Sequence, residues 1–339
     1  SYTVLAGAGD GAAKLLVTEV NAGPNIFPDY LGMQQIAPEF IEINNPNAYP
    51  VDMSDYYLTD AINYVGTTQQ YWYITDGNPT QQTVGGGHYN DFTARFPEGY
   101  TVAAGQTIVI SMASSGWFEQ VYRQLPDLEL YADEMSVAGV PPMRPVFTNP
   151  EGEPEGDSIF TPDREAGGSE QLPRGIPELE EHYGEPLILY YWDPEDAVVV
   201  DIDVFMWGDS KEGQYSVGFD KTDEEGYNPD TPIADQEWFY PVDETGDVTY
   251  TRVDPDEAGQ ATLGSNGVDG RDEAGEHWNE TFVLAYPTPG VFLAGLEPSQ
   301  DVVLTVPART FLPKLGETFE IEMTTSENAE TKLRIIDME

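Results

Sequence analysis

Short runs of alternating apolar and polar residues recur along the chain and predict β-strands rather than long helices. Two such runs face each other across a loop, at residues 15–20 and 39–44, and a third follows a bend within 51–59. Helical spacing of apolar residues predicts one short helix at 118–125. Short strands separated by Gly and Pro turns predict an all-β sandwich of the immunoglobulin-like type. Further strands are expected at 71–74, 101–111, 187–192, 198–207 and 281–284.

The same pattern divides the chain into segments. Residues 1–14 are small and rich in Gly and Ala, and they predict an extended N-terminal arm. The sandwich is expected to occupy 15–290, interrupted at 139–186 by a long surface insertion in which Pro, Gly and Glu dominate. After a linker at 291–300, alternation returns in 301–339 and predicts part of a second β module.

Three stretches near the N-terminus carry a family resemblance by their order. They read LVTEV at 16–20, EFIEINNP at 39–46 and VDMSDYYLTD at 51–60. They resemble the lamin-tail domain, an immunoglobulin-like β-sandwich found in many bacterial secreted and surface proteins. A Pro-x-Gly turn and strand at 97–110 and the late stretch 203–290 fit the same family.

The resemblance covers about 15–290 and depends on the order of the motifs rather than on one diagnostic motif. The insertion at 139–186 and the Tyr- and Gln-rich stretch before Arg95 depart from a minimal domain of this family. Residues 301–339 resemble the first half of the small Ig-like modules at the C-termini of bacterial secreted proteins. The resemblance implies an exported protein without catalytic activity.

Charge is the extreme feature of the composition. The chain of 339 residues carries 61 acidic and 14 basic residues, for a formal net charge of −47. A field of this sign repels nucleic acid and anionic membranes and attracts divalent cations and basic partners. The apolar runs are shorter than the roughly 18 residues that span a bilayer, so neither nucleic-acid binding nor membrane insertion is expected. A solvated surface suited to salty water is the simplest explanation of the charge.

The N-terminal residues and the cysteine content bear on location. The chain contains no Cys, and residues 1–9 have neither a charged region nor a long apolar region. Such a start is typical of a mature protein after signal-peptide removal. We therefore expect an extracellular or cell-surface location.

Closely spaced acidic residues supply the hard oxygen ligands that Ca²⁺ prefers. One cluster is Asp201, Asp203 and Asp209, in which strand alternation places the first two on one face, so that they could share a cation. None of the clusters has EF-hand spacing. The composition predicts a structural calcium ion, with solvated acidic loops as the alternative. The other two clusters are Asp220, Asp223, Glu224, Glu225, Asn228 and Asp230, and Asn266, Asp269, Asp272, Glu273 and Glu276.

Catalytic signatures are weak in the sequence. The three His residues, His88, His182 and His277, are scattered, and zinc sites usually need clustered His or Cys. No Gly-x-Ser-x-Gly elbow and no Cys supports a nucleophile. Pairs of carboxylates carry no information in a chain with 61 acidic residues. The sequence therefore predicts a protein that is not an enzyme.

Assembly and glycan binding are the remaining hypotheses. The arm lacks a hairpin partner, so Tyr2, Thr3, Val4 and Leu5 are candidates for strand exchange with another copy; a disordered arm is the alternative. Asn279 lies in a glycosylation sequon. A core role competes with sugar binding for the aromatic residues Tyr71, Trp72, Tyr73, Tyr190, Tyr191 and Trp192.

The predicted function is that of a structural or adhesive extracellular protein, acting as the repeating subunit of a surface or filamentous assembly. Self-association or binding to other surface proteins follows from this hypothesis. A carbohydrate-binding or hydrolase-associated module is the alternative, with glycans as partners. The acidic enzyme of a salt-loving organism is a third hypothesis. The strand carboxylates of Glu19 and Glu42 are expected to hydrogen-bond nearby loops.

Overall fold

The computed structural model describes part of the chain. The described residues are 12–22, 26–28, 34–36, 38–62, 70–76, 92–146, 179, 185–208, 218–240, 248–256 and 263–292. They belong to one compact unit that extends over Ser1–Gly295. The arm residues Tyr2, Thr3, Val4 and Leu5, the candidate ligand Asp209, most of 139–186 and the second module at 301–339 lie outside the described residues.

The larger sheet has six strands and carries the N-terminal strand near its centre. Strand β10 runs parallel to β9, and the other neighbours are antiparallel. In sheet order the strands are β10 (Leu128–Glu129), β9 (Thr107–Ser111), β4 (Phe40–Asn44), β1 (Leu16–Asn21), β14 (Thr249–Arg252) and β15 (Phe282–Ala285).

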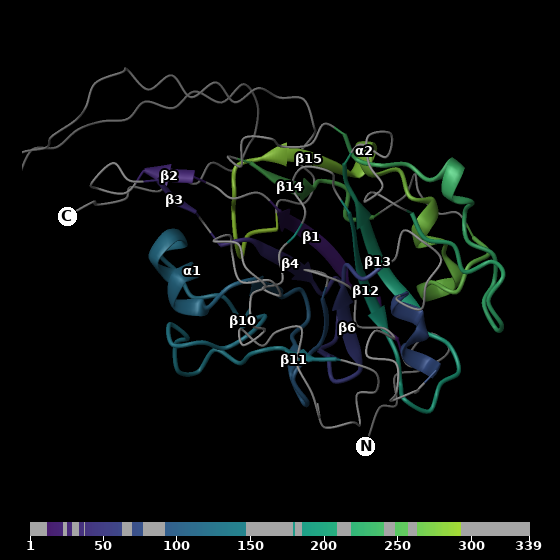
Figure 1. Ribbon diagram of the computed structural model, residues 1–339, viewed down its shortest axis with the longest axis horizontal. Coiled ribbons are helices and arrows are strands. Elements are labelled where there is room, and N and C mark those ends of the chain that lie inside the picture. Colours follow the sequence, from purple (N-terminus) through teal and green to yellow (C-terminus); the bar gives the residue numbers. More distant parts are fainter. Residues whose placement is uncertain are drawn as a thin grey trace, which may run out of the picture. The chain divides into compact units, whose positions relative to one another are not determined.

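The second sheet has five antiparallel strands and lies against the first (Figure 1). Two small pairs lie outside the main sheets, β2 (Ile26–Pro28) with β3 (Gln34–Ile36) and β5 (Val51–Asp52) with β8 (Thr101–Val102). In sheet order the five strands are β11 (Arg144–Pro145), β7 (Thr93–Arg95), β6 (Tyr56–Thr59), β12 (Pro186–Tyr191) and β13 (Val200–Met206).

Helices are short in the described part of the chain. The longest is α1 (Ser115–Tyr122), which confirms the helix expected at 118–125 within a few residues. None of the described helices is long and apolar enough to cross a membrane. The others are α2 (Trp278–Thr281) and the 3₁₀-helices η1 (Tyr71–Asp76), η2 (Ile233–Asp235), η3 (Val268–Gly270) and η4 (Glu273–Gly275).

The core fills the space between the two sheets, as expected for a sandwich. Alternate residues of β4, Ile41 and Ile43, join it, together with Leu187 and Leu189 of β12 and Phe205 of β13. Strands β1 and β13 contact each other across the two sheets. The predicted all-β sandwich is therefore confirmed.

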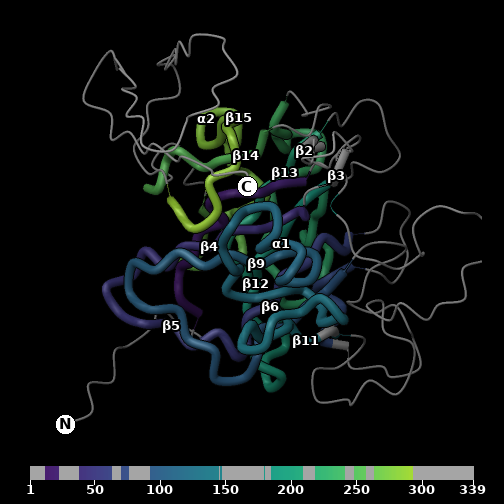
Figure 2. The backbone as a smooth tube through the Cα atoms, turned by 90° about the vertical axis from the view of Figure 1, so that its left-hand side faces the viewer, coloured from purple at the N-terminus to yellow at the C-terminus, as the bar shows by residue number. Residues whose placement is uncertain are grey.

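The opposite face of the six-stranded sheet is covered as well. Helix α1 packs Phe118 and Tyr122 against Phe40 of β4 and Val109 of β9, with edge-on ring contacts to Phe40. Figure 2 shows α1 on the side of β4 and β9. The outer face of an antiparallel sheet is often exposed to solvent. Here the polar residues of β1 and β4 that alternate with the core residues are covered by other segments of the chain.

The structure differs from the local expectations at 71–74 and at 249–252. Residues 71–74 were expected to be a strand but form η1, in which Tyr71 and Trp72 are buried together. Strand β14 was missed within a region interpreted as acidic loops. Both runs are short, and their environment overrides a weak local preference.

Candidate functional site

An ion pair between Asp203 of β13 and Arg252 of β14 links the two sheets. Arg252 Nη2 lies 2.7 Å from both carboxylate oxygens of Asp203, and both side chains are fully buried. The backbone N–H of Val17 in β1 donates to Asp203 Oδ2 at 2.5 Å, and Arg252 Nε donates to the Val17 carbonyl at 2.7 Å. The guanidinium also lies 4.8 Å from the ring centre of Phe282. These contacts join three strands of both sheets.

Two further acidic residues lie beside this pair and define a candidate metal centre. Asp203, Glu273 and Glu276 are all buried, and each offers a carboxylate oxygen within 4.8 Å of the others. Glu273 opens η4, the short helix that contacts β13. Three oxygen donors of this type suit a hard divalent cation. Of the candidate ligands expected from the sequence, these three are the ones that form a group of carboxylates able to hold one ion among the described residues.

A second buried cluster surrounds Lys221. Its Nζ lies 2.7 Å from Asp201 Oδ2 and 3.0 Å from Asp230 Oδ2. Tyr71 donates its hydroxyl proton to Asp201 Oδ1 at 2.7 Å and accepts from Lys221 Nζ at 3.1 Å. Ser265 Oγ and the backbone N–H of Lys221 donate to the two oxygens of Asp230. The cluster ties β13, η1 and two loops together.

Burial shifts the protonation equilibria of this cluster. Desolvation raises the pKa of the Asp201 carboxyl, because Lys221 only partly offsets the cost of a buried charge. Burial alone would lower the pKa of Lys221, but the two carboxylates outweigh it and raise that pKa. One ammonium facing two carboxylates leaves an excess negative charge, so the cluster favours one extra proton.

The two acids of β13 do not use a common partner among the described contacts. Asp201 pairs with Lys221, whereas Asp203 pairs with Arg252. The register with β12 shifts between Leu189 and Tyr190, which pair with Asp203 and Asp201. Such a bulge breaks the simple alternation on which the expectation of a shared cation depended. Each of the two carboxylates therefore has a different cationic side chain of the protein as its ion-pair partner.

The remaining candidate residues have separate roles. Asp272 caps η4 by accepting from the N–H of Ala274 at 3.2 Å, and it accepts from Thr231 Oγ1 at 2.6 Å. Asp269 is exposed at a positive φ of 60°. Asn279 is exposed on α2, but its side-chain amide donates to Glu237 Oε1 at 2.6 Å. The structure does not bring these residues to the carboxylates of Asp203, Glu273 and Glu276.

Glu19 and Glu42 are neighbours in the pairing of β1 with β4, on the face away from the core. Both are fully buried, under the loop after β15. Thr288 donates its N–H and its hydroxyl to Glu19, at 2.9 and 3.0 Å, and the N–H of Gly290 donates to Glu42 at 2.7 Å. Thr18 Oγ1 donates to Glu42 at 2.7 Å. The expected hydrogen bonds to nearby loops are therefore confirmed.

Desolvation dominates the electrostatics of this pair. Burial raises the pKa of Glu42 to about 8, with a smaller contribution from the charge of Glu19. Burial also raises the pKa of Glu19 against three opposing hydrogen-bond contributions, two from Thr288 and one from Thr249. With no cation among their described partners, these two adjacent buried carboxyls favour the protonated form.

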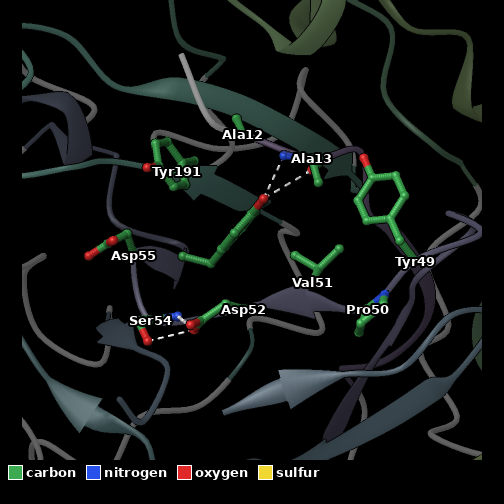
Figure 3. Close-up of a pocket in the computed structure, with 10 residues that line it drawn as sticks. Ala12, Ala13, Tyr49, Pro50, Val51, Asp52, Ser54, Asp55 and Tyr191 are labelled. Atoms are coloured by element: carbon green, nitrogen blue, oxygen red, sulfur yellow. Dashed lines mark hydrogen bonds between the residues drawn. The ribbon is translucent and has the colours of Figure 1, made fainter. Parts of the chain in front are cut away.

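A pocket of about 540 Å³ lies where the described chain begins. Figure 3 shows Tyr191 and Tyr49 on opposite sides of the pocket, Asp55 on the same side as Tyr191, and Asp52 and Ser54 lower down. Asp52 Oδ1 accepts from the N–H and hydroxyl of Ser54, at 3.0 and 2.6 Å, and Asp55 forms an ion pair with Arg95. Tyr56 binds the backbone of Ala13, which fixes the chain at the pocket wall.

Most of the candidate sugar-binding aromatic residues belong to the core instead. Tyr71, Trp72, Tyr190 and Trp192 are buried, and Tyr57 stacks on Tyr190 with ring centres 5.0 Å apart. Tyr73 and Tyr191 are half-buried. Of the six, Tyr191 lines the pocket.

Comparison with known proteins adds little to this description. No family model matches the chain, and no curated protein matches it. One similar solved structure is the crystal structure of a DUF4876 family protein from Bacteroides thetaiotaomicron. It has 12% sequence identity and a TM-score of 0.41, over 81% of this chain and 72% of that chain. We draw no conclusion from a likeness at this level.

Lys221 and Arg252, the two cations at the centres of these clusters, were not among the residues predicted from the sequence. The available signal was their rarity, because the chain has 14 basic residues against 61 acidic ones. Lys221 also stands alone within the acidic stretch 220–225. A lone basic residue in such a sequence is a candidate partner for buried acids.

Proposed function

We propose that this protein is a non-catalytic extracellular structural or adhesive subunit, related to lamin-tail domains, that self-associates through its N-terminal arm. The main support is the use of its buried charged side chains. Asp203 with Arg252 and Asp201 with Lys221 join strands and loops of the same chain. Glu19 and Glu42 anchor a loop on the outer face. Charged side chains that bind one another and the backbone in this way stabilise the fold.

The anchor of the arm supports self-association. Ala12 and Ala13 are buried, and Ala13 N–H donates to Tyr56 OH at 2.6 Å. The chain before this anchor can therefore be removed without touching the described core. An arm attached to a fixed point can pair with an open strand edge of another copy.

Sedimentation of the full chain tests the proposal. We expect assemblies for the intact chain and monomers for a variant lacking residues 1–11, with the same thermal midpoint because the Ala13 anchor remains. A chain with a Gly/Ser sequence of equal length in place of 1–11 controls for length. Unchanged assembly of both variants would show that the arm is not responsible.

Calcium dependence belongs to the same proposal. Asp203, Glu273 and Glu276 are the described acids that suit a structural Ca²⁺. Adding a chelator should lower the thermal midpoint, and adding back excess Ca²⁺ should restore it. An unchanged midpoint in chelator would refute the calcium part alone.

The pocket gives a specific reason to keep the carbohydrate-binding alternative. Aromatic rings and carboxylates together, as at Tyr49, Tyr191 and Asp52, can stack on and hydrogen-bond a sugar. A monomeric chain that binds defined members of a glycan array would favour this alternative over assembly.

A further inference from the structure

Lys221 lies between two carboxylic acids in the interior of the protein. Its side chain and those of Asp201 and Asp230 are 0%, 2% and 1% exposed. The amine is 4.4 Å from the ring centre of Phe219, and the rings of Tyr71, Trp72 and Tyr227 lie within 6.0 Å. A primary amine next to a carboxyl carbon, with water excluded, is the pair of groups that condenses to an amide.

Each oxygen of Asp201 has a different neighbour. Lys221 Nζ lies 2.7 Å from Oδ2, and the hydroxyl of Tyr71 donates to Oδ1 at 2.7 Å. Attack by the amine on Cγ would develop negative charge on Oδ1, where the Tyr71 hydroxyl already lies. A donor fixed at the developing oxyanion stabilises the tetrahedral intermediate.

Asp230 lies where it can accept a proton from the amine of Lys221. Its Oδ2 lies 3.0 Å from Lys221 Nζ and accepts from the Lys221 backbone N–H at 2.8 Å. Its Oδ1 accepts from Ser265 Oγ at 2.6 Å. These two donors orient the carboxylate beside the amine, which is the geometry of a general base.

The geometry points to an intramolecular amide cross-link between Lys221 Nζ and Asp201 Cγ, formed with loss of one water molecule and assisted by Asp230 and Tyr71. The link extends the structural role proposed above. It joins β13, the last strand in the order of its sheet, to the described segment 218–240. The chain contains no Cys, so a disulfide cannot supply a covalent tie of this kind.

The reaction balances without any other reactant. It starts from the ammonium of Lys221, the carboxylate of Asp230 and the protonated carboxyl of Asp201, which together are neutral. Lys221 gives a proton to Asp230, and the nitrogen lone pair forms a bond to Cγ of Asp201 while the C=O electron pair moves to Oδ1. Asp230 takes a second proton from nitrogen and gives one to Oδ2. The Oδ1 pair restores C=O, the Cγ–Oδ2 bond breaks and water leaves, with Asp230 protonated.

The intact mass of the full chain under denaturing conditions tests the cross-link. We expect a mass one water lower than the sequence mass, and fragmentation of a proteolytic digest should find Lys221 joined to Asp201. This measurement does not depend on assembly, so its failure and the failure of the proposed function are separate results. A folded chain that keeps the full sequence mass after prolonged incubation would overturn the inference.

Substitutions of Asp230, Asp201 and Tyr71 test the role of each residue in the reaction. Asp230→Asn keeps both reacting groups but removes the base, so it should retain its full mass, whereas the exposed control Asp223→Asn should lose water. Asp201→Asn should react with loss of ammonia in place of water, because the leaving group changes. Tyr71→Phe should slow the loss of water in a time course after refolding. Loss of water from a folded Asp201→Ala variant would place the dehydration elsewhere and overturn the inference.

Formation of the link has a consequence for stability. It closes the segment between Asp201 and Lys221, which are 20 positions apart. Closing a segment of this length restricts the unfolded chain and should raise the thermal midpoint by several degrees over folded Asp230→Asn. Equal midpoints for cross-linked and unlinked chains would contradict a stabilising role.

Discussion

The protein buries acidic side chains in two regions by different physical means. Between the sheets, Asp201 and Asp203 face the cations Lys221 and Arg252 at 2.7 Å. On the outer face of the larger sheet, Glu19 and Glu42 have hydroxyl and N–H donors as their described partners. In the first region, a specific cationic side chain offsets the cost of burying each carboxylate. In the second region, proton uptake by the carboxyls offsets that cost. The two regions should therefore respond differently to mutation and to pH.

Removing a cation from the inner region should have the largest effect. Arg252→Met leaves Asp203 buried beside Glu273 and Glu276 without its ion-pair partner. We expect the free energy of unfolding to fall by about 3–5 kcal/mol, as for other broken buried pairs. Urea unfolding measures it, with exposed Arg123→Met as a control that removes the same charge. A loss similar to the control would show that the ion pair is not the main tie between the sheets.

The outer pair should make stability depend on pH. Because the folded protein raises the pKa of Glu42 from 4.5 to about 8, it binds more protons than the unfolded chain between these values. This contribution is fully present below about pH 4.5 and is lost as the pH rises through about 8. Glu42→Gln removes the titration, so the fall in unfolding free energy over this window should shrink by up to about 5 kcal/mol.

Urea unfolding at a series of pH values tests this expectation. Glu225→Gln, at an exposed position, is the matched control and should leave the pH dependence close to that of the parent chain. If Glu42→Gln and Glu225→Gln give the same pH dependence, protonation of the outer pair does not govern stability.

The smallest expected effect concerns one hydrogen bond of the loop. Thr288→Val removes the hydroxyl that donates to Glu19 Oε2 at 3.0 Å but keeps the N–H donor. We expect a loss of about 1 kcal/mol and faster amide exchange at Gly290, whose N–H donates to Glu42. Exposed Thr222→Val serves as the control. Unchanged exchange at Gly290 would mean that the loop is held by other contacts.

Periodicity predicted the outer region better than the inner one. The strands β1 and β4 follow from alternation within 15–20 and 39–44, and the acids inside them were expected to bind loops. In contrast, alternation suggested a shared cation for Asp201 and Asp203, and a bulge against β12 gives them different partners. A register shift depends on the neighbouring strand, which a single strand's pattern does not contain.

The aromatic residues also show that local sequence patterns do not contain the effect of distant contacts. The pattern at 71–74 fitted a strand, yet Tyr71 lies in η1 because its ring and hydroxyl pack against Phe219 and Asp201. Tyr71 and Asp201 are 130 positions apart. Contacts at such separation decide the conformation of a short segment and leave no trace in local spacing.

The sequence by itself determined the all-β class, the positions of most strands and the strongly acidic surface, because these follow from local alternation and from composition. The tertiary structure decided which acids are buried, which cation each one contacts and which three carboxylates come together. Asp203 meets Arg252 from 49 positions away, and Glu19 meets Thr288 from 269 positions away. Electrostatic partners are chosen by proximity in space, and the packing of two sheets creates that proximity only after the strands have formed.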